Sequence, residues 1–216
     1  MQKNILTKQI EIYQQNIQDA PRDYIGASSI GADCWRQIWY EFKGEKSTSV
    51  IPQTRRTWDI GRHLEGLVIE WLTKSGLEIS TAPWSLQSSE ISIFKGHIDA
   101  LLIDKEKKVI VEIKTAKYSS FNNFVAKGLK LWSPQYYAQV QSYMGMSGIF
   151  SAYIVVLNKD NSDISDEKVE FDHVFYKTLE QKAKEISEAI TPPPRINSSP
   201  FWYQCKMCKY HGVCHV

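Results

Sequence analysis

The pattern of apolar and polar residues along the chain predicts a mixed α/β protein. Two segments, 109–113 and 151–157, are apolar at nearly every position, which is typical of strands buried on both faces. Other segments repeat their apolar residues at helical spacing. The expected helices cover residues 4–19, 28–42, 58–75, 119–130, 134–146 and 176–190. We therefore expect a mixed central sheet flanked by helices.

The segments between these helices predict the rest of the fold. Further strands are expected between residues 77 and 114, and an alternating strand from 168 to 175 follows a turn at 158–168. The proline-rich stretch 191–200 is expected to be an extended connector. Neither an internal repeat nor a second domain boundary is evident, so we expect one domain over residues 1–216.

Charged residues interrupt the apolar strand at 109–113. Glu112 and Lys114 lie two positions apart, so on a strand their side chains point to the same side. The turn DKEKK precedes this strand, and a hairpin there would place Asp99 beside Glu112. Carboxylates bind Mg²⁺ or Mn²⁺, and a nearby lysine can position an attacking water. The pattern predicts metal-dependent phosphodiester cleavage; the alternative is a solvated surface ion pair.

The four cysteines suggest a second metal site. Cys205, Cys208 and Cys214 follow a C-x2-C-x5-C pattern near the C-terminus, whereas Cys34 lies far upstream. A set of four thiolates suits either an iron–sulfur cluster or zinc. The histidines of the tail, His211 and His215, are alternative zinc ligands. In a zinc knuckle confined to the tail, Cys34 would be a buried core thiol.

Composition indicates the class of protein and its expected location, but it does not indicate a binding partner. Hydrophobic residues make up 43% and charged residues 23% of the 216 residues, as in ordinary globular domains. No apolar run approaches the roughly 18 residues that span a bilayer, and the N-terminus lacks signal-peptide features. We therefore expect no membrane association and a cytoplasmic location, in a host cell if the chain is encoded by a phage. The net charge of +2 neither supports nor excludes a nucleic-acid partner.

Several motifs, taken in order, resemble those of one nuclease family. They are SSIGADCWRQIWYEFKG, DIGRHLEGLVIEWLTKSG, GHID, VEIKTA, PQYYAQVQSYM and the cysteine tail. Together they are similar to the PD-(D/E)XK superfamily, and specifically to RecB-like exonucleases with four cysteines, which include CRISPR-associated and phage members. The resemblance spans about residues 27 to 214. One departure is Ile98, which occupies the proline position of the superfamily name.

The resemblance implies a restriction-endonuclease-like core and assigns roles to residues. It implies a [4Fe–4S] cluster held by Cys34, Cys205, Cys208 and Cys214, with cluster-binding segments around 28–42 and 200–216. The implied catalytic and metal-binding residues are Glu65, Asp99, Glu112, Lys114 and Gln139, with the carbonyl of Ile113 as a further metal ligand. His63 is the alternative to Glu65 for the helix position. Glu65 borders the apolar stripe of its helix, whereas His63 lies further toward solvent, which favours Glu65.

DNA contacts are expected from basic and aromatic residues near these motifs. Tyr143, Arg55, Arg56 and Lys117 are the candidates, since cations follow a phosphate backbone and aromatic rings stack on unpaired bases. The alternative for Tyr143 is a core aromatic ring. For each basic residue taken singly, a solvated charged face is the better expectation, whereas the basic and aromatic residues as a group favour a nucleic-acid groove. The expected function is metal-dependent exonuclease activity on single-stranded DNA or duplex ends, in recombination, repair, phage DNA processing or CRISPR adaptation. The alternatives are a DNA-binding subunit of a larger recombination or CRISPR-adaptation assembly, with weak or partner-dependent cleavage, and a zinc-stabilised interaction protein.

Overall fold

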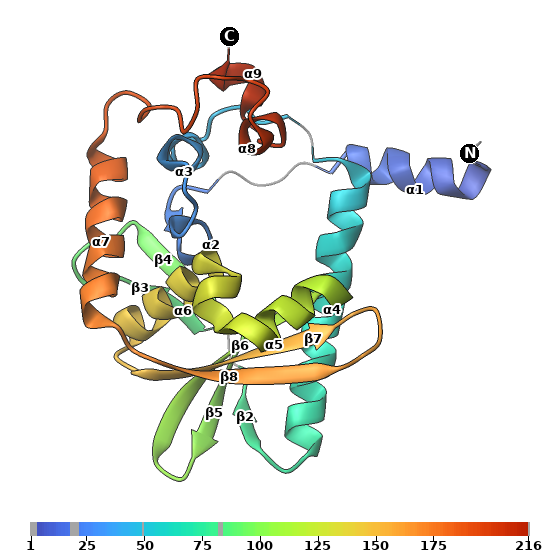
Figure 1. Cartoon of the computed structure of the whole chain (residues 1–216), viewed down its shortest axis with the longest axis vertical. Helices are drawn as coiled ribbons and strands as arrows, with labels where there is room; N and C mark the ends of the chain where they lie inside the picture. The colour runs from blue at the N-terminus through green and yellow to red at the C-terminus, as the bar shows by residue number, and fades with distance from the viewer. Residues whose placement is uncertain (1–3, 18–21, 49, 82–83, 216) are drawn as a thin grey trace.

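The protein consists of two β-sheets with helices packed around them (Figure 1). A computed structural model describes residues 4–17, 22–48, 50–81 and 84–215. Its strands are β1 (Ile25–Gly26), β2 (Glu78–Ser80), β3 (Trp84–Gln87), β4 (Phe94–Ile98), β5 (Ala100–Asp104), β6 (Lys107–Ala116), β7 (Ser151–Asn158) and β8 (Ile164–Glu170). Its helices are α1 (Ile5–Gln15), α2 (Ala27–Ile30), α3 (Trp35–Phe42), α4 (Pro52–Lys74), α5 (Tyr118–Trp132), α6 (Pro134–Ser147), α7 (His173–Glu188), α8 (Tyr203–Lys206) and α9 (His211–Cys214).

The larger sheet has the strand order β2-β5-β6-β7-β8, with β6 at its centre. β6 pairs antiparallel with β5 and parallel with β7, and the remaining neighbours are antiparallel. A parallel pair needs a long crossover, which α5 and α6 supply here. The expected mixed sheet is confirmed, and the Glu-x-Lys strand, expected to be buried on both faces, lies at its centre.

The chain passes from the smaller sheet to the larger one at a single residue. The smaller sheet has the order β1-β4-β3, and β4 ends at Ile98. Asp99 forms a bend, and β5 begins at Ala100 in the other sheet. The pairing of β5 with β6 runs from the turn between them to its far end at Ala100 and Val111. The predicted β5–β6 hairpin is thus confirmed, and Asp99 lies where the two sheets separate.

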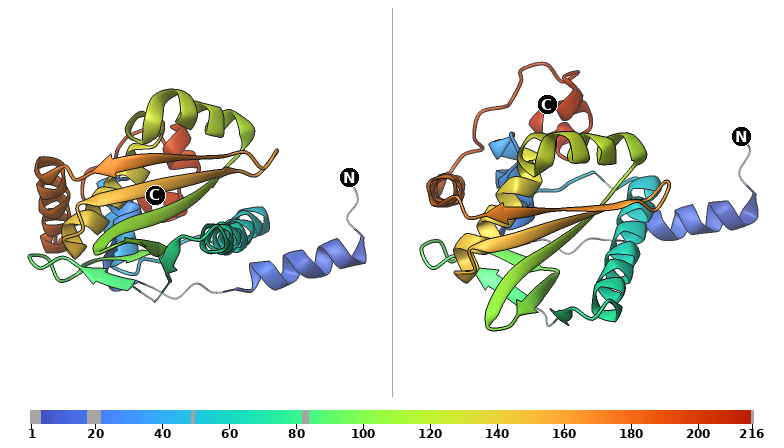
Figure 2. Two further views of the ribbon diagram at one scale, coloured as in Figure 1. Left: turned by 90° about the horizontal axis from the view of Figure 1, so that it is seen from below. Right: turned by 60° about the horizontal axis from the view of Figure 1, so that its bottom comes forward.

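Helices cover both faces of the larger sheet, as the two views of Figure 2 show. On one face α4 contributes Val68 and Leu64, which pack with Val111 and Ile113 of β6. The opposite face carries the main core, in which Ile110 packs with residues of α5, α6 and α7. Residues alternate between the two cores along β6 because successive strand side chains point to opposite faces.

Two sequence expectations about element boundaries are wrong. Residues 28–42 form two helices, because the chain breaks between α2 and α3 at Gly31. A Cβ on Gly31 would lie 2.7 Å from the Cα of Gln135 in α6, so this break permits close packing against α6. The expected strand at 168–175 begins earlier and ends at Glu170, because Asp172 caps the N-terminus of α7 through the N–H of Phe175.

Other boundaries differ less from the prediction. α4 begins at Pro52, six residues before the expected start, because proline suits the first turn of a helix. The expected helix 4–19 is observed as α1, and its residues 18–19 lie outside the described part of the chain. Residues 82–83 of the expected strand region also lie outside it.

The C-terminal tail packs on the N-terminal part of the chain. The ring of Tyr210 is buried and lies 5.4 Å from the ring of Tyr40 in α3. Thr48 donates two hydrogen bonds, from its backbone N–H and its hydroxyl, to the carbonyl of Lys209. None of the helices in the described segments has the length and apolar character needed to cross a membrane.

Candidate active site

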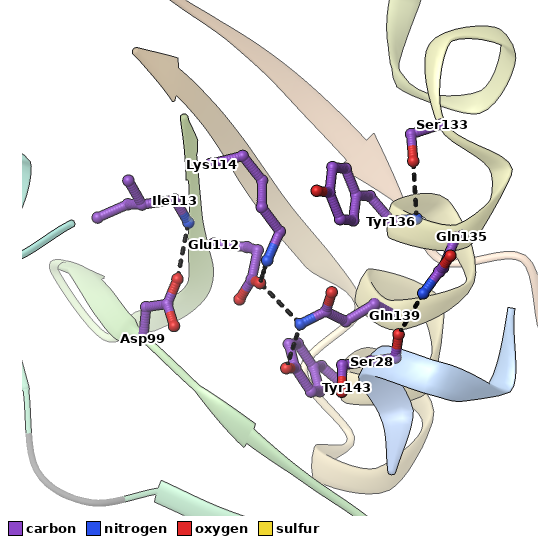
Figure 3. A network of polar contacts seen from close by, with 10 residues as sticks. All are labelled: Ser28, Asp99, Glu112, Ile113, Lys114, Ser133, Gln135, Tyr136, Gln139 and Tyr143. Carbon is purple, nitrogen blue, oxygen red and sulfur yellow. Dashed lines mark hydrogen bonds and ion pairs between the residues drawn. The ribbon is translucent and has the colours of Figure 1, made fainter. Parts of the chain in front are cut away.

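Asp99 is held at the open edge of the central strand. Within the described residues, β6 has no paired strand on its β5 side beyond Val111. The side chain of Asp99 compensates, because its Oδ2 accepts a hydrogen bond of 2.8 Å from the N–H of Ile113 (Figure 3). The separation of the sheets therefore both exposes this edge and places a carboxylate on it.

Glu112 is buried and hydrogen-bonded from two directions. Its Oε1 accepts a bond of 2.5 Å from the Nζ of Lys114 and one of 2.8 Å from the Nε2 of Gln139. The same Nε2 of Gln139 donates to the hydroxyl of Tyr143 at 2.6 Å, so α6 fixes the carboxylate through this pair (Figure 3). Glu112 is 1% exposed, and a carboxyl group buried to this extent requires hydrogen-bond partners.

Lys114 is positioned by an aromatic ring as well as by Glu112. Its Nζ lies 4.8 Å from the ring centroid of Tyr136, within the range of a cation–π interaction. Tyr136 was not among the candidate site residues that the sequence suggested. The signal was present in the spacing, because Tyr136 and Gln139 are three residues apart and therefore share a face of α6.

The structure distinguishes the two candidates for the helix position on α4. Glu65 is partly buried, and its carboxyl group lies within hydrogen-bonding reach of Asp99. His63 is exposed, and its Nδ1 contacts the carbonyl of Asp59 on its own helix at 2.8 Å. Glu65 thus joins Asp99 and Glu112, whereas His63 does not.

The convergence of acids perturbs their ionisation. Burial, followed by the neighbouring Asp99, raises the pKa of Glu65 to about 7. Burial also raises the pKa of Glu112 to about 8, although Lys114 opposes the shift. Burial disfavours the charged form of Lys114, but the adjacent Glu112 outweighs it and raises the pKa of this lysine. A buried group of acids with raised pKa values is typical of a functional site.

The carboxylates fit a divalent cation, although they are not arranged as a complete ligand shell. Glu112 Oε2 is buried without a hydrogen-bond partner, which leaves one carboxylate oxygen available. Among the described residues, no three or more His, Cys, Asp or Glu side chains form a group ready to hold a metal ion. Asp99 Oδ2 and Glu112 Oε1 already accept hydrogen bonds from other groups of the protein. The carbonyl of Ile113 as a ligand stays a prediction.

Gly96 is a site residue that sequence reasoning missed. A Cβ at this position would lie 2.6 Å from Cε1 of Tyr143 and 3.0 Å from the Cβ of Ala27. Only glycine lets Tyr143 lie against β4 while its hydroxyl contacts Gln139. The glycine of the GHID motif was visible, but its contact with α6 could not be inferred from local pattern.

The four expected DNA contacts lie in different environments. Tyr143 is 3% exposed, which favours the core-packing alternative for its ring. Arg55 is buried and donates to the carbonyl of Ile17, and Arg56 donates to Oε1 of Gln14, so both connect α4 to the α1 region. Lys117 is exposed at the start of α5, directly after β6. Of the four, Lys117 retains the surface position expected of a DNA contact.

The structure gathers the cysteines from both ends of the chain. None of the four forms a disulfide. Burial raises the pKa of the Cys205 thiol, and nearby Cys214 and Cys34 add to the shift. Burial likewise raises the pKa of Cys208, with further contributions from the other cysteines. The thiols are thus within electrostatic reach of one another, although they do not form the close group of a ready-made mononuclear metal site.

Comparison with protein families places this geometry in a known group. A family described as "YqaJ-like viral recombinase domain" matches residues 18–149. The chain belongs to this family. The YqaJ-like region includes Glu65, Asp99, Glu112, Lys114 and Gln139, and it ends before the cysteine tail. None of the curated protein sequences matches the chain significantly.

Solved structures share the fold of this YqaJ-like protein. One is LHK-Exo, an alkaline exonuclease from Laribacter hongkongensis, in complex with dAMP; it has a TM-score of 0.60 and 14% identity over 83% of this chain and 90% of that chain. Another is a phage related exonuclease from Haemophilus somnus 129PT, with a TM-score of 0.53 and 14% identity over 70% of this chain and 77% of that one. At this identity the similarity establishes the fold.

Proposed function

We propose that this YqaJ-like protein is a metal-dependent DNA exonuclease that hydrolyses phosphodiester bonds in single strands or duplex ends. The observation that carries the proposal is the convergence of Glu65, Asp99 and Glu112 beside Lys114 at the open edge of β6. The three acids come from α4, the β4–β5 bend and β6, and they lie close together although like charges repel one another. Such a group suits divalent-metal phosphoryl chemistry.

The proposed roles follow from the contacts of each side chain. Glu65, Asp99 and Glu112 would hold Mg²⁺ or Mn²⁺, which stabilises negative charge on the phosphate when bound. Lys114 positions the attacking water and offsets the charge that develops on the phosphate. Gln139 orients Glu112, because its side-chain amide donates to Glu112 Oε1. The same amide also donates to the hydroxyl of Tyr143, which holds Gln139 in place. The ring of Tyr136 restricts Lys114 through the cation–π contact.

The comparisons support the DNA substrate and the setting. The family is described as a viral recombinase domain, and two proteins of the same fold are named as exonucleases, one of them in complex with the nucleotide dAMP. This favours recombination or phage DNA processing over CRISPR adaptation among the settings that the sequence suggested. An active site on the fold still has to be argued from its residues.

Degradation of end-labelled DNA tests the proposal. We expect the wild type with Mg²⁺ or Mn²⁺ to release labelled nucleotides, and Lys114→Ala and Asp99→Asn to lose most of this activity. Lys108→Ala is the matched control, since Lys108 is exposed on the same strand. Thermal melts identify variants that fail to fold. Equal activity of Lys114→Ala, Asp99→Asn and the wild type would refute the assignment, and blocked 5′ or 3′ ends would give the polarity.

A second part of the proposal concerns the cysteines. We propose that Cys34, Cys205, Cys208 and Cys214 hold a [4Fe–4S] cluster that fixes the C-terminal tail against α3. The support is the gathering of four free thiols from distant parts of the chain. Anaerobic purification should then yield brown protein with iron and sulfide. Stoichiometric zinc without iron would refute the cluster and leave the zinc alternative.

A further inference from the structure

The segment before the buried Cys205 exposes an unusual set of large side chains. Phe201 is 85%, Trp202 41%, Tyr203 63% and Met207 81% exposed. Trp202 and Tyr203 lie with their ring centroids 5.0 Å apart, and Met207 follows Tyr203 by four residues, which is about one helical turn. We call these four residues the C-terminal aromatic patch. An exposed group of this kind marks an interaction surface.

The patch is held in place by the surrounding chain. The N–H of Trp202 donates to the carbonyl of Ser199, and the N–H of Phe201 lies 3.3 Å from the hydroxyl oxygen of the same serine. Gln204 contacts Asp33, and Arg195 donates to the carbonyl of Cys214, so both sides of the segment are attached to neighbouring parts of the protein. The backbone that carries the rings is therefore attached to the rest of the protein, and binding a partner requires ordering of the side chains only.

The charge around the patch identifies the partner. Residues 189–216 contain Arg195, Lys206 and Lys209 together with two histidines, and they contain no Asp or Glu. Lys206 is exposed between Tyr203 and Met207. The segment 197–212 also lacks Leu, Ile and Val, the aliphatic residues of ordinary protein cores. In the structure Lys209 pairs with Glu41 of α3 and Asp33 contacts Gln204, so Lys206 is the exposed cation next to the rings. Aromatic rings beside an exposed cation suit a polyanion whose bases are unpaired.

We propose that the C-terminal aromatic patch binds single-stranded DNA by stacking on its unpaired bases, with Lys206 close to the phosphate backbone. The patch lies outside the region matched by the YqaJ-like family and on different elements from the candidate active site (Figure 1). The inference rests on the proposed function for its choice of DNA over RNA. Base stacking itself does not require cleavage.

Binding of fluorescein-labelled dT20 in EDTA tests this inference without cleavage. The double variant Phe201→Ala/Tyr203→Ala removes two mostly exposed rings and keeps Trp202. Loss of one stacked base weakens binding about 5- to 150-fold, so we expect at least the lower end of this range in anisotropy titrations. Blunt duplex DNA offers no unpaired base for stacking, and its affinity should stay within about twofold of the wild type.

Two matched variants separate stacking from other effects. Tyr13→Ala removes an exposed aromatic ring from α1, and it should leave the affinity for dT20 unchanged. Lys206→Ala should lower the salt dependence of dT20 binding by about one counterion. Thermal melts establish that each variant is folded.

The outcomes distinguish this inference from the proposed function. Unchanged affinity of Phe201→Ala/Tyr203→Ala for dT20 would overturn the inference, whatever the nuclease assay shows. The patch would then be a candidate surface for a protein partner. An equal loss of affinity for blunt duplex would also overturn it, since stacking would not be the cause. If the wild type bound dT20 through the patch but degraded no DNA with any metal, the proposed function would fail and the inference would stand.

Discussion

Replacing Glu112 by Gln should remove most of the loss of stability that the metal-free protein undergoes as pH rises toward 8, and it should abolish the nuclease activity. The carboxyl group is 1% exposed, and burial raises its pKa from 4.5 to about 8. An amide has nearly the same shape, and its oxygen can still accept from Lys114 and Gln139. The substitution therefore removes the cost of ionising a buried acid and preserves most of the packing. It also takes away the charge that raises the pKa of Lys114, so the pH dependence of stability, and not its absolute value, reports on Glu112.

The sign of the pH dependence follows from the raised pKa. Below pH 4.5 Glu112 is protonated in both the folded and the unfolded state, so it contributes no pH dependence. Between pH 4.5 and about 8 the unfolded chain releases this proton while the folded protein retains it, and stability falls as pH rises. At 1.36 kcal/mol per pKa unit the full shift corresponds to about 5 kcal/mol. From pH 5 to pH 8 we expect the wild type to lose about 2–4 kcal/mol more unfolding free energy than Glu112→Gln.

Urea unfolding followed by tryptophan fluorescence measures this difference. The titrations are made in EDTA at constant ionic strength, at pH 5, 6.5 and 8. Glu106→Gln is the control, because Glu106 is an exposed acid in the β5–β6 turn and its removal should not change the slope. Parallel pH profiles for the wild type and Glu112→Gln would refute the argument that Glu112 is buried at a cost.

Addition of a divalent cation extends the same test to the proposed metal site. A cation that binds the folded protein stabilises it by mass action, so Mg²⁺ or Mn²⁺ should raise the unfolding free energy of the wild type. Glu112→Gln should gain much less, since it lacks one proposed ligand. If both proteins gained equally, Glu112 would not be a metal ligand.

Two further predictions concern the residues behind the site. Gly96→Ala should destabilise the protein by about 1–3 kcal/mol and reduce cleavage, because the new Cβ would collide with the ring of Tyr143; urea unfolding and end-labelled DNA assays measure both. Gly66→Ala, in open space on α4, should be neutral or stabilising by up to about 1 kcal/mol, and a comparable loss there would contradict the packing argument. Tyr136→Leu should lower kcat about 2- to 30-fold, because the cation–π contact with Lys114 contributes about 0.5–2 kcal/mol. Tyr136→Phe keeps the ring, so a similar loss of kcat in that variant would rule out the cation–π explanation.

The local sequence determined the elements that carry the site. An apolar run containing Glu112 and Lys114 predicts a buried strand with two charges on one side, because side chains alternate along a strand. The DKEKK turn predicts the hairpin that brings Asp99 next to this strand. Pro134 and Gly148 mark the limits of α6, because proline favours a first turn and glycine adopts the left-handed conformation after a helix.

Only the tertiary structure decided how these elements meet. The hydrogen bond from Ile113 to Asp99 depends on where two sheets separate, and the contact of Glu65 with Asp99 depends on how α4 packs across the sheet. The fit of Tyr143 against Gly96 joins residues far apart in the sequence. Periodicity reports which face of an element is buried, whereas these contacts depend on close packing between elements, which leaves no periodic signal in either segment.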